Sequence, residues 1–465
     1  MAHSDRRRKI HASNQVVGRR GFLSASAAGA TAVASGAVSS FTSTANAFAN
    51  EAPGDLPSQS DRPRIGCIGT GSMGMGDAQA HAAFGDIVAV CDVDTRRAEA
   101  AKNHDSIGKG KADAYGDYRK VLERQDIDVV SIVTSDPWHV KIAVEALQAG
   151  KHVFCQKPLS LTLEENQLAR AAAQKFPTLQ FFIGTQQRAQ KDQFLRAVNM
   201  VHKGLLGDIQ KVTVGINGSP TGGPFPVVAP PSELNWDMWL GQAPKAEYRN
   251  NRCHYEFRWW YEYSGGKFTD WGAHHVDIAQ WALREDAKGK GPITIDGTDV
   301  KHPVPYKDGY ATVDDCYNTS HDFAVNCTFP SGVEMMVTSR GDNGILFEGT
   351  KGRIFVNREK ITGTPIAEAW DKDAWADADV IKLYKGKPFE GHKQNFYRCI
   401  REGGLPVSDV FSHVIAMNTC HLAAIAGRLG RTIRWDPVAE KIVGDEQAAS
   451  FAARKPREGF EINRV

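Results

Sequence analysis

A glycine-rich turn that follows a short apolar run is the strongest constraint on what this chain can fold into. The run from Arg64 passes into Gly69, Gly71 and Gly74 at G-x-G-x-x-G spacing, which predicts a strand, a phosphate-binding turn and a helix. Gly69 permits a tight turn, Gly71 lets the backbone approach a pyrophosphate, and Gly74 lets the helix pack against the strand. A plain strand-to-helix turn is the alternative interpretation of these glycines.

An acidic residue after the next apolar run favours the dinucleotide interpretation. The run Ile87–Cys91 ends at Asp92, about 20 residues beyond the glycines, where a carboxylate can accept hydrogen bonds from both ribose hydroxyls. Asp92 would also repel a 2′-phosphate, so NAD is favoured over NADP. Arg96 and Arg97 follow closely and could pair with that phosphate, which keeps NADP open as the second choice.

The composition describes an ordinary globular protein and excludes a general affinity for nucleic acid. The 465 residues suffice for about two or three domains. The first 47 residues hold six of the 56 basic and one of the 54 acidic groups, so the remainder has 50 basic and 53 acidic groups. The eight cysteines form no C-x-x-C pair, which predicts buried free thiols and neither a disulfide framework nor a metal site.

The N-terminal segment has the pattern of an export signal. A basic start at residues 6–9 leads to Arg19-Arg20-Gly-Phe22-Leu23, a weakly apolar stretch and Ala45-Asn-Ala47 as a cleavage site. The paired arginines resemble a twin-arginine signal, so we expect residues 1–47 to be an export signal and residues 48–62 a linker. A disordered tail or a membrane anchor is the alternative.

This export route predicts a periplasmic protein and a tightly held cofactor. A twin-arginine route carries folded proteins, so a dinucleotide could be loaded before export. No later segment has comparable unbroken apolar length, and we expect no membrane contact of the mature form.

The first half of the chain predicts a Rossmann domain over residues 63–185. The run Val129–Val133 is fully apolar, as in a parallel sheet covered on both faces, and is followed by the loop Thr134–His139. The strand His152–Cys155 leads into Gln156-Lys157-Pro158. Both of these segments follow the carboxyl ends of strands, where doubly wound sheets bind their ligands.

The second half, residues 186–465, predicts an α+β domain for substrate binding and oligomerisation. Alternation at Ile209–Ile216, Phe323–Phe329 and Val333–Ser339 favours a large, mostly antiparallel sheet decorated with helices. Aromatic residues are dense between Leu234 and Trp281, and we expect most of them to pack in the core or at an interface. We expect this aromatic-rich sheet to cover its open face with another subunit, which gives a homodimer or homotetramer.

Several motifs together resemble the Gfo/Idh/MocA oxidoreductase family, whose type members include glucose-fructose oxidoreductase and inositol dehydrogenase. They are the glycine turn, Asp92, Gln156-Lys157-Pro158, and Gly265-Gly266 followed by Asp270-Trp-Gly-Ala-His274. The family pattern has Glu-Lys-Pro, so Gln156 is a departure that keeps the hydrogen-bonding shape and loses the charge. The resemblance implies oxidation of a secondary alcohol of a sugar or cyclitol by hydride transfer to a nicotinamide.

Three residues of these motifs suit that chemistry. Hydride removal requires loss of the hydroxyl proton, so a base and a cation are needed near the oxygen. Asp270 and His274 are four residues apart, on one face if they share a helix, so His274 is the expected proton acceptor and Asp270 its partner or a substrate ligand. Lys157 is expected to polarise the oxygen, or to be the base if burial lowers its pKa. A surface lysine is the plain alternative.

Further residues are candidates for contacts with the ligands. Arg188 and Asp277 are possible substrate contacts, beside Lys157, Asp270 and His274. His275 is interpreted as structural and no metal site is expected, because adjacent helical positions point about 100° apart. The expected cofactor-binding residues are Gly69, Gly71, Ser72, Met73, Gly74, Asp92, Arg97, Thr134, Trp138, His139, Gln156 and Lys157.

Three functions fit these features. The first is a periplasmic NAD(P)-dependent sugar or cyclitol dehydrogenase. The second is a glycosidase or lyase that oxidises a sugar carbon transiently, eliminates a substituent and returns the hydride. The third is a non-catalytic nucleotide- or sugar-binding protein, which the joint presence of Lys157, Asp270 and His274 disfavours.

Overall fold

The computed structural model describes residues 62–364 and 377–465. The predicted export signal, and the predicted linker up to residue 61, lie outside the described residues.

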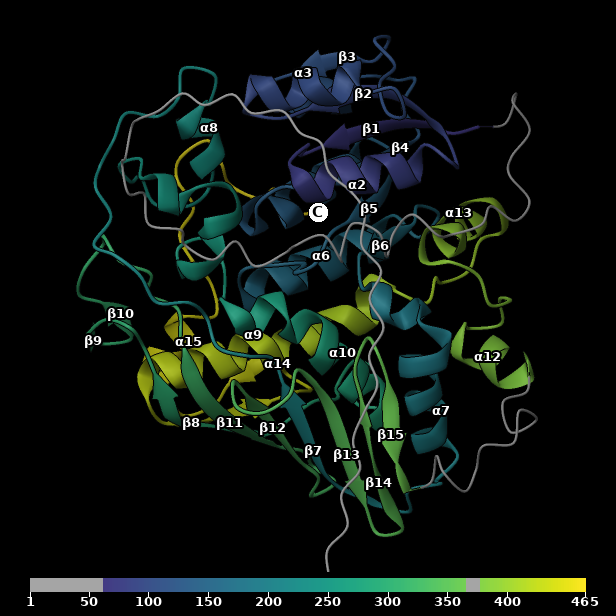
Figure 1. The fold of residues 1–465 in the computed structure, drawn as a ribbon, viewed down its shortest axis with the longest axis vertical. Helices are drawn as coiled ribbons and strands as arrows, with labels where there is room; N and C mark the ends of the chain where they lie inside the picture. The colour runs from purple at the N-terminus through teal and green to yellow at the C-terminus, as the bar shows by residue number, and fades with distance from the viewer. Residues whose placement is uncertain (1–61, 365–376) are drawn as a thin grey trace, which may run out of the picture. The chain divides into compact units, whose positions relative to one another are not determined.

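A six-stranded parallel sheet forms the first layer, in the order β3-β2-β1-β4-β5-β6 (Figure 1). This order reverses between β1 and β4, and such a switch point is where doubly wound sheets bind dinucleotides. The predicted Rossmann fold is therefore confirmed. Its elements are β1 Arg64–Ile68, α2 Ser72–His81, β2 Asp86–Cys91, α3 Thr95–Asn103, β3 Asp113–Tyr115, α4 Arg119–Leu122, β4 Val129–Ile132, α5 His139–Gln148, β5 His152–Cys155, α6 Leu163–Lys175 and β6 Phe181–Ile183.

A nine-stranded sheet forms the second layer, in the order β15-β14-β13-β7-β12-β11-β8-β16-β17. All of its pairs are antiparallel except β7 with β12, so the predicted large, mostly antiparallel sheet is confirmed. Its strands are β7 Ile209–Gly215, β8 Thr294–Lys301, β11 Asp322–Thr328, β12 Glu334–Thr338, β13 Gly344–Gly349, β14 Gly352–Val356, β15 Ile361–Gly363, β16 Thr432–Asp436 and β17 Lys441–Ile442.

Helices and one short hairpin complete the described chain. They are α7 Arg196–His202, α8 Trp236–Leu240, α9 Lys267–Asp270, α10 Gly272–Leu283, the hairpin β9 Tyr306–Lys307 with β10 Tyr310–Ala311, α12 Asp377–Leu383, α13 His392–Glu402, α14 Val410–Leu429 and α15 Glu446–Ser450. Helix α14 contacts β8 of the large sheet and α6 of the parallel sheet, so it joins the two layers.

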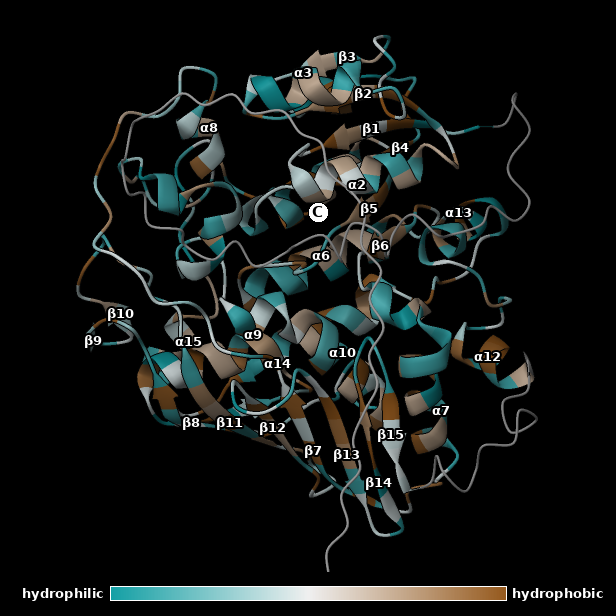
Figure 2. Cartoon of the chain, viewed as in Figure 1, coloured by the Kyte–Doolittle hydropathy of each residue, from teal (hydrophilic) through white to brown (hydrophobic). Residues whose placement is uncertain are grey.

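Alternating burial along the strands gives the large sheet an inner and an outer face. Val212, Val214, Val337 and Ile345 are fully or almost fully buried against the helices. Figure 2 shows the apolar stretches of β12 and β13 in this sheet. Burying one such side chain contributes about 1.5–3 kcal/mol. The two-residue period therefore fixes which face of each strand meets the core.

The dense aromatic residues between 234 and 281 do not lie on the strands of this sheet, contrary to our expectation. Trp239, Tyr248, Trp259, Trp260 and Tyr263 are buried with one another in a separate cluster beside the parallel sheet's ligand edge. Trp239 packs edge-to-face on Tyr263 with 5.3 Å between the ring centroids, an arrangement that aromatic pairs favour.

Helix α14 is long and apolar enough to cross a membrane, but 94% of its apolar window is buried inside the protein. We interpret it as the core helix between the sheets. All eight cysteines are free, and seven are buried, as the sequence predicts.

Candidate active site

The turn between β1 and α2 has the backbone that the glycine pattern predicts. Gly69 has φ +86°, and a Cβ there would lie 2.4 Å from the carbonyl oxygen of Val133. A Cβ on Gly74 would lie 2.0 Å from the carbonyl oxygen of Gly69. Each of these two positions therefore requires glycine. A Cβ on Gly71 would meet only the flexible guanidinium of Arg97, at 2.6 Å, so this glycine keeps backbone open toward a ligand.

Hydrogen bonds fix Asp92 at the end of β2. Its carboxylate accepts the backbone N–H of Thr70 at 2.8 Å and that of Asp94 at 2.9 Å. Burial raises the pKa of the Asp92 carboxyl, although these two bonds favour its charged form. Helix α2 has no side-chain N-cap, so its first amides are available to an anion.

A cavity of about 260 Å³ lies along the ligand edge of the parallel sheet. One wall is the glycine turn with Asp92, and the other comes from residues 238–258 of the second half. The glycine-rich turn Gly69–Gly74, here called the glycine cradle, and the first amides of α2 suit the pyrophosphate of a dinucleotide. Asp92 suits its ribose, so the site fits NAD. The predicted cofactor residues that line the cavity are Gly69, Gly71, Ser72, Met73, Gly74, Asp92, Arg97, Thr134, Trp138, Gln156 and Lys157.

His139 is the exception among the predicted cofactor residues. It is 1% exposed and does not line the cavity. Its two ring nitrogens lie 2.6 Å from the carbonyl oxygen of Pro158 and 3.1 Å from that of Thr134. Since both nitrogens lie against backbone oxygens, His139 connects the loop after β4 with the segment after β5, and the structure brings it to these loops and not to the cavity lining.

Lys157, which lines the cavity, is bound to Asp270. Its ammonium donates to the carboxylate Oδ1 of Asp270 at 2.8 Å and to the backbone oxygen of the same residue at 3.0 Å. Arg258 and Lys267 lie 3.6 and 3.8 Å from that carboxylate. Burial would raise the pKa of Asp270, but Lys157 and then the two other cations hold it well below its usual range.

His274 does not pair with Asp270, contrary to our expectation. The predicted single helix is interrupted at Trp271, where α9 ends and α10 begins, so the four-residue spacing does not bring the two side chains into a hydrogen bond. His274 is 3% exposed and is not among the residues that line the cavity. Burial and then Lys157 lower its pKa well below its usual value, so the imidazole is neutral at pH 7. Its buried Nδ1 has no hydrogen-bond partner among the described residues.

Gln156 uses both ends of its amide. Its Nε2 donates to the Asp77 carboxylate at 2.7 Å, and its Oε1 accepts the backbone N–H of Lys157 at 3.1 Å. Lys393 donates to the other oxygen of Asp77, also at 2.7 Å. A glutamate at 156 would place a second carboxylate against Asp77 in a buried site, so the neutral amide fits this surrounding. Gln156 thereby positions the backbone of Lys157.

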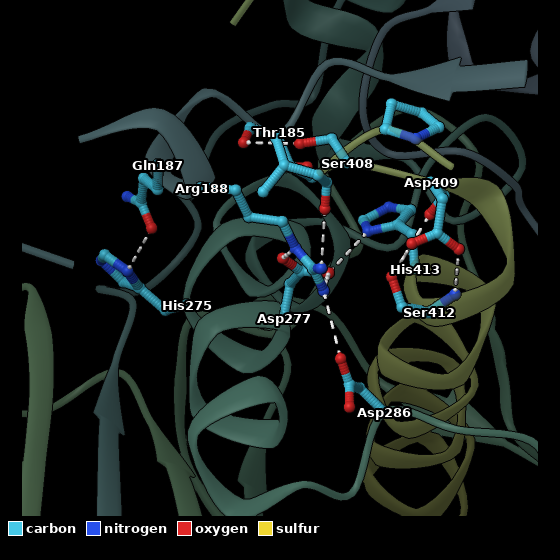
Figure 3. Close-up of polar contacts among 12 residues, drawn as sticks. Thr185, Gln187, Arg188, His275, Asp277, Asp286, Ser408, Asp409, Ser412 and His413 are labelled. Atoms are coloured by element: carbon cyan, nitrogen blue, oxygen red, sulfur yellow. Dashed lines mark hydrogen bonds and ion pairs between the residues drawn. The ribbon is translucent and has the colours of Figure 1, made fainter. Parts of the chain in front are cut away.

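Arg188 and Asp277 form a buried ion pair with each other (Figure 3). Arg188 Nε and Asp277 Oδ2 are 2.6 Å apart, and the two side chains are 1% and 0% exposed. Arg188 also donates to the carbonyl oxygen of Val407, and His413 Nδ1 lies 3.1 Å from Asp277 Oδ1. The pair connects the segment after β6 with α10 and α14. The predicted substrate contacts at Arg188 and Asp277 are therefore corrected to a structural role.

His275 is buried on α10 and has a partner for each ring nitrogen. Its Nδ1 lies 3.2 Å from Gln187 Oε1, which Figure 3 shows, and its Nε2 lies 2.9 Å from Asn343 Oδ1. This is a structural histidine. Within residues 62–364 and 377–465, no group of three or more His, Cys, Asp or Glu side chains could hold a metal ion.

The second wall of the cavity was missed by sequence reasoning. Its residues are Met238, Trp239, His254, Tyr255, Phe257 and Arg258. Asp136, in the loop after β4, also lines the cavity and was missed. The high density of aromatic residues was the signal in the sequence for this stretch. The spacing of these residues has no period, so it does not show which side chains face a ligand.

The fold and the cradle define a two-domain protein with a dinucleotide site. The model of the "Oxidoreductase family, NAD-binding Rossmann fold" matches residues 63–182, and that of the "Oxidoreductase family, C-terminal alpha/beta domain" matches residues 199–462. Together they span most of the chain, so it belongs to the Gfo/Idh/MocA oxidoreductase family, as the motifs predict. Its cofactor is NAD.

Curated relatives align over part of the chain. A glycosyl hydrolase family 109 protein 2 of Shewanella sp. (strain ANA-3) is 39% identical over 158 residues, which is 32% of this chain and 35% of that protein. The inositol 2-dehydrogenase of Salmonella typhimurium is 34% identical over 147 residues, 31% of this chain and 43% of that protein. The chain thus matches less than half the length of these relatives.

Solved structures share the fold at low identity. The WlbA dehydrogenase from Chromobacterium violaceum has a TM-score of 0.55 at 19% identity, over 82% of this chain and 98% of that one. A levoglucosan dehydrogenase has a TM-score of 0.56 at 17% identity, over 80% and 99%. At this identity the likeness supports the fold alone.

The structural role of the buried ion pair leads to a prediction for stability. Arg188→Gln should lower the free energy of unfolding by about 3–5 kcal/mol, because it leaves the Asp277 carboxylate buried without its main partner. Urea unfolding measures this loss. The control is Arg340→Gln, which breaks an exposed pair with Asp299 and should cost less than about 1 kcal/mol. Wild-type stability combined with a raised KM would instead make Arg188 a substrate contact.

Proposed function

We propose that this protein is an NAD-dependent dehydrogenase that oxidises a secondary alcohol of a sugar or cyclitol. The observation that carries the proposal is the Lys157 ammonium, held by Asp270 at 2.8 Å inside the cavity of the dinucleotide. A cation at this position stabilises the negative charge that develops on a hydroxyl oxygen as its proton leaves. When bound, NAD supplies the acceptor for the hydride.

The surrounding side chains divide the remaining tasks. Asp270 stays ionised and keeps the Lys157 ammonium charged and aimed at the cavity. The neutral His274 does not line the cavity, but its buried Nδ1 has no hydrogen-bond partner among the described residues, so it can accept the hydroxyl proton after transfer through Lys157. Gln156 holds the backbone from which Lys157 projects.

A second function, on the same residues, is a glycosidase or lyase that uses a transient keto-sugar. The observation that favours it is the 39% identity, over 158 residues, to a glycosyl hydrolase family 109 protein. In that cycle the hydride returns to the sugar after elimination of its substituent. Product analysis separates the two: a dehydrogenase accumulates a ketone and NADH in equal amounts, whereas the cycle releases a substituent and leaves no net NADH.

Export of the folded protein would require that the cofactor stays bound during and after transport. We propose that the chain is exported by the twin-arginine route to the periplasm with NAD already in its site. The glycine cradle and the enclosing wall of residues 238–258 support tight retention, since both sides of the dinucleotide would be covered.

The catalytic assignment predicts the effect of three substitutions. Lys157→Ala and His274→Ala should each lower single-turnover reduction of bound NAD⁺ by about 10² to 10⁴, and the double variant should lose little more, because both act on one proton. Asp270→Asn should be intermediate. Absorbance at the NADH band, with a panel of sugars and cyclitols, provides the rates.

The matched control is His275→Asn, which alters the neighbouring imidazole on α10 and should retain most of the rate. Reduction of bound NAD⁺ at the wild-type rate in both Lys157→Ala and His274→Ala would contradict the mechanism. A collapse in the control together with loss of a stoichiometric metal would indicate a metal site instead.

We also propose that the outer face of the nine-stranded sheet joins two or four subunits. The row Phe355, Leu346, Thr213 and Met336 crosses four neighbouring strands in register and is only half-buried. Beside it runs a row of alternating charge: Arg353, Glu348, Lys211 and Glu334. An apolar row rimmed by paired charges suits a self-complementary interface.

Light scattering at micromolar concentration should therefore give at least twice the monomer mass, and Leu346→Asp should reduce it to the monomer. The control is Val438→Asp, which puts the same charge at a site 75% exposed between β16 and β17 and should not change the mass. A monomeric wild-type protein would refute this assembly.

A further inference from the structure

Positive charge exceeds negative charge around the reaction centre. Three cations, Lys157, Arg258 and Lys267, lie within 4 Å of the single carboxylate of Asp270. Their side chains are only 13%, 23% and 14% exposed, so water screens them weakly. One carboxylate cannot neutralise three such groups.

The nearest further carboxylate compensates only in part. Asp136 lines the cavity and is 3% exposed, and its Oδ2 accepts the hydroxyl of Ser264 at 2.6 Å. Burial raises the pKa of Asp136 to about 7, so near neutral pH this carboxyl is more readily protonated than an exposed aspartate and offsets less positive charge.

Arg358 adds a fourth cation. It lies between β14 and β15, with its guanidinium carbon 4.7 Å from the centre of the Trp271 ring. It is close enough to influence both Asp270 and His274 electrostatically. Its buried Nε has no hydrogen-bond partner, and it forms no ion pair with any residue in the described part of the chain.

A half-buried guanidinium without a carboxylate beside it is costly for a folded protein, because it loses hydration without gaining a counter-ion. The pyrophosphate of the cofactor does not supply this counter-ion, since its cradle is the turn after β1 and Lys157 and Arg258 lie elsewhere in the cavity lining. Lys157 and Arg258 line the cavity, and Arg358 stacks on Trp271, the residue after Asp270, so the excess positive charge borders the space where the substrate hydroxyl would meet Lys157.

We propose that the substrate is an anionic carbohydrate, with an oxyanion group, a carboxylate or a phosphate, that binds Arg358 and Arg258 while its reacting hydroxyl contacts Lys157. This inference rests on the proposed dehydrogenase function and specifies its substrate class. Guanidinium groups bind such oxyanions through two parallel hydrogen bonds, which positions the sugar ring as well as neutralising the site.

Matched sugars test this directly. Isothermal titration of the full-length, NAD-loaded protein with D-glucose, D-glucuronate and D-glucose 6-phosphate, and with the pair D-galactose and D-galacturonate, measures binding independently of turnover. At least one anionic member should bind about tenfold or more tightly than its neutral counterpart, and 0.5 M NaCl should weaken that binding selectively. Which member binds distinguishes carboxylate from phosphate recognition.

Three variants and a control assign the effect to residues. Arg358→Gln should weaken binding of the anionic sugar about tenfold more than that of the neutral one, and Arg358→Lys should fall between, because it keeps charge and loses the planar fork. Arg258→Gln should act in the same direction. The control is Arg431→Gln, which removes an arginine that pairs with Asp445 just before β16 and does not line the cavity, and it should leave the discrimination unchanged.

The outcomes separate this inference from the function on which it rests. Equal or tighter binding of every neutral sugar, or an equal loss for both classes in Arg358→Gln, would overturn the anionic substrate. Reduction of bound NAD⁺ by neutral sugars alone would overturn it while supporting the dehydrogenase. Selective binding of an anionic sugar without NADH formation by any sugar would support it and refute net dehydrogenation.

Discussion

The ion pair between Lys157 and Asp270 is the interaction on which the site depends. Lys157 follows the fifth strand of the parallel sheet, and Asp270 ends a short helix of the second half of the chain. Neither half can assemble the reaction centre alone, because the cation comes from one and its counter-ion from the other. A cavity that holds a dinucleotide is thereby connected to the groups that handle a proton.

Buried polar contacts maintain this geometry from several directions. Gln156 links the Lys157 backbone to Asp77 of α2, so helix α2 and Lys157 share one hydrogen-bonded network. Arg188 and Asp277 anchor α10, which carries His274, to the segment after β6. Breaking such a buried contact is costly, because it leaves a polar or charged group without its partner. Forming it adds little net stability, so its main effect is to hold the side chains in one geometry.

The sequence predicts the dinucleotide half well because its signals are local. At Gly69 and Gly74 an added Cβ would lie less than 2.5 Å from backbone atoms, and Asp92 accepts hydrogen bonds from the backbone N–H groups of Thr70 in the glycine turn and of Asp94 two residues on. The alternating strands of the second sheet are also local patterns. Family motifs single out Lys157, Asp270 and His274, and the structure joins the first two by a hydrogen bond.

The sequence does not predict contacts between side chains that come from distant parts of the chain. Asp270 and His274 have helical spacing, but the chain breaks its helix between them, so the carboxylate partners Lys157. Arg188 and Asp277 are 89 residues apart and their mutual pairing has no sequence signature. Arg358 comes from a strand connection far along the chain, and only the folded structure brings it near Asp270.

The central claim is that Lys157 and Asp270 arrange a substrate carbon for direct hydride transfer to the bound nicotinamide. A sugar that reduces the bound nucleotide, prepared with deuterium on the carbon of the reacting hydroxyl, tests it most directly. Mass spectrometry of the nucleotide released immediately after a single turnover should show NADH heavier by one deuterium. Unlabelled NADH from the labelled sugar would contradict the account.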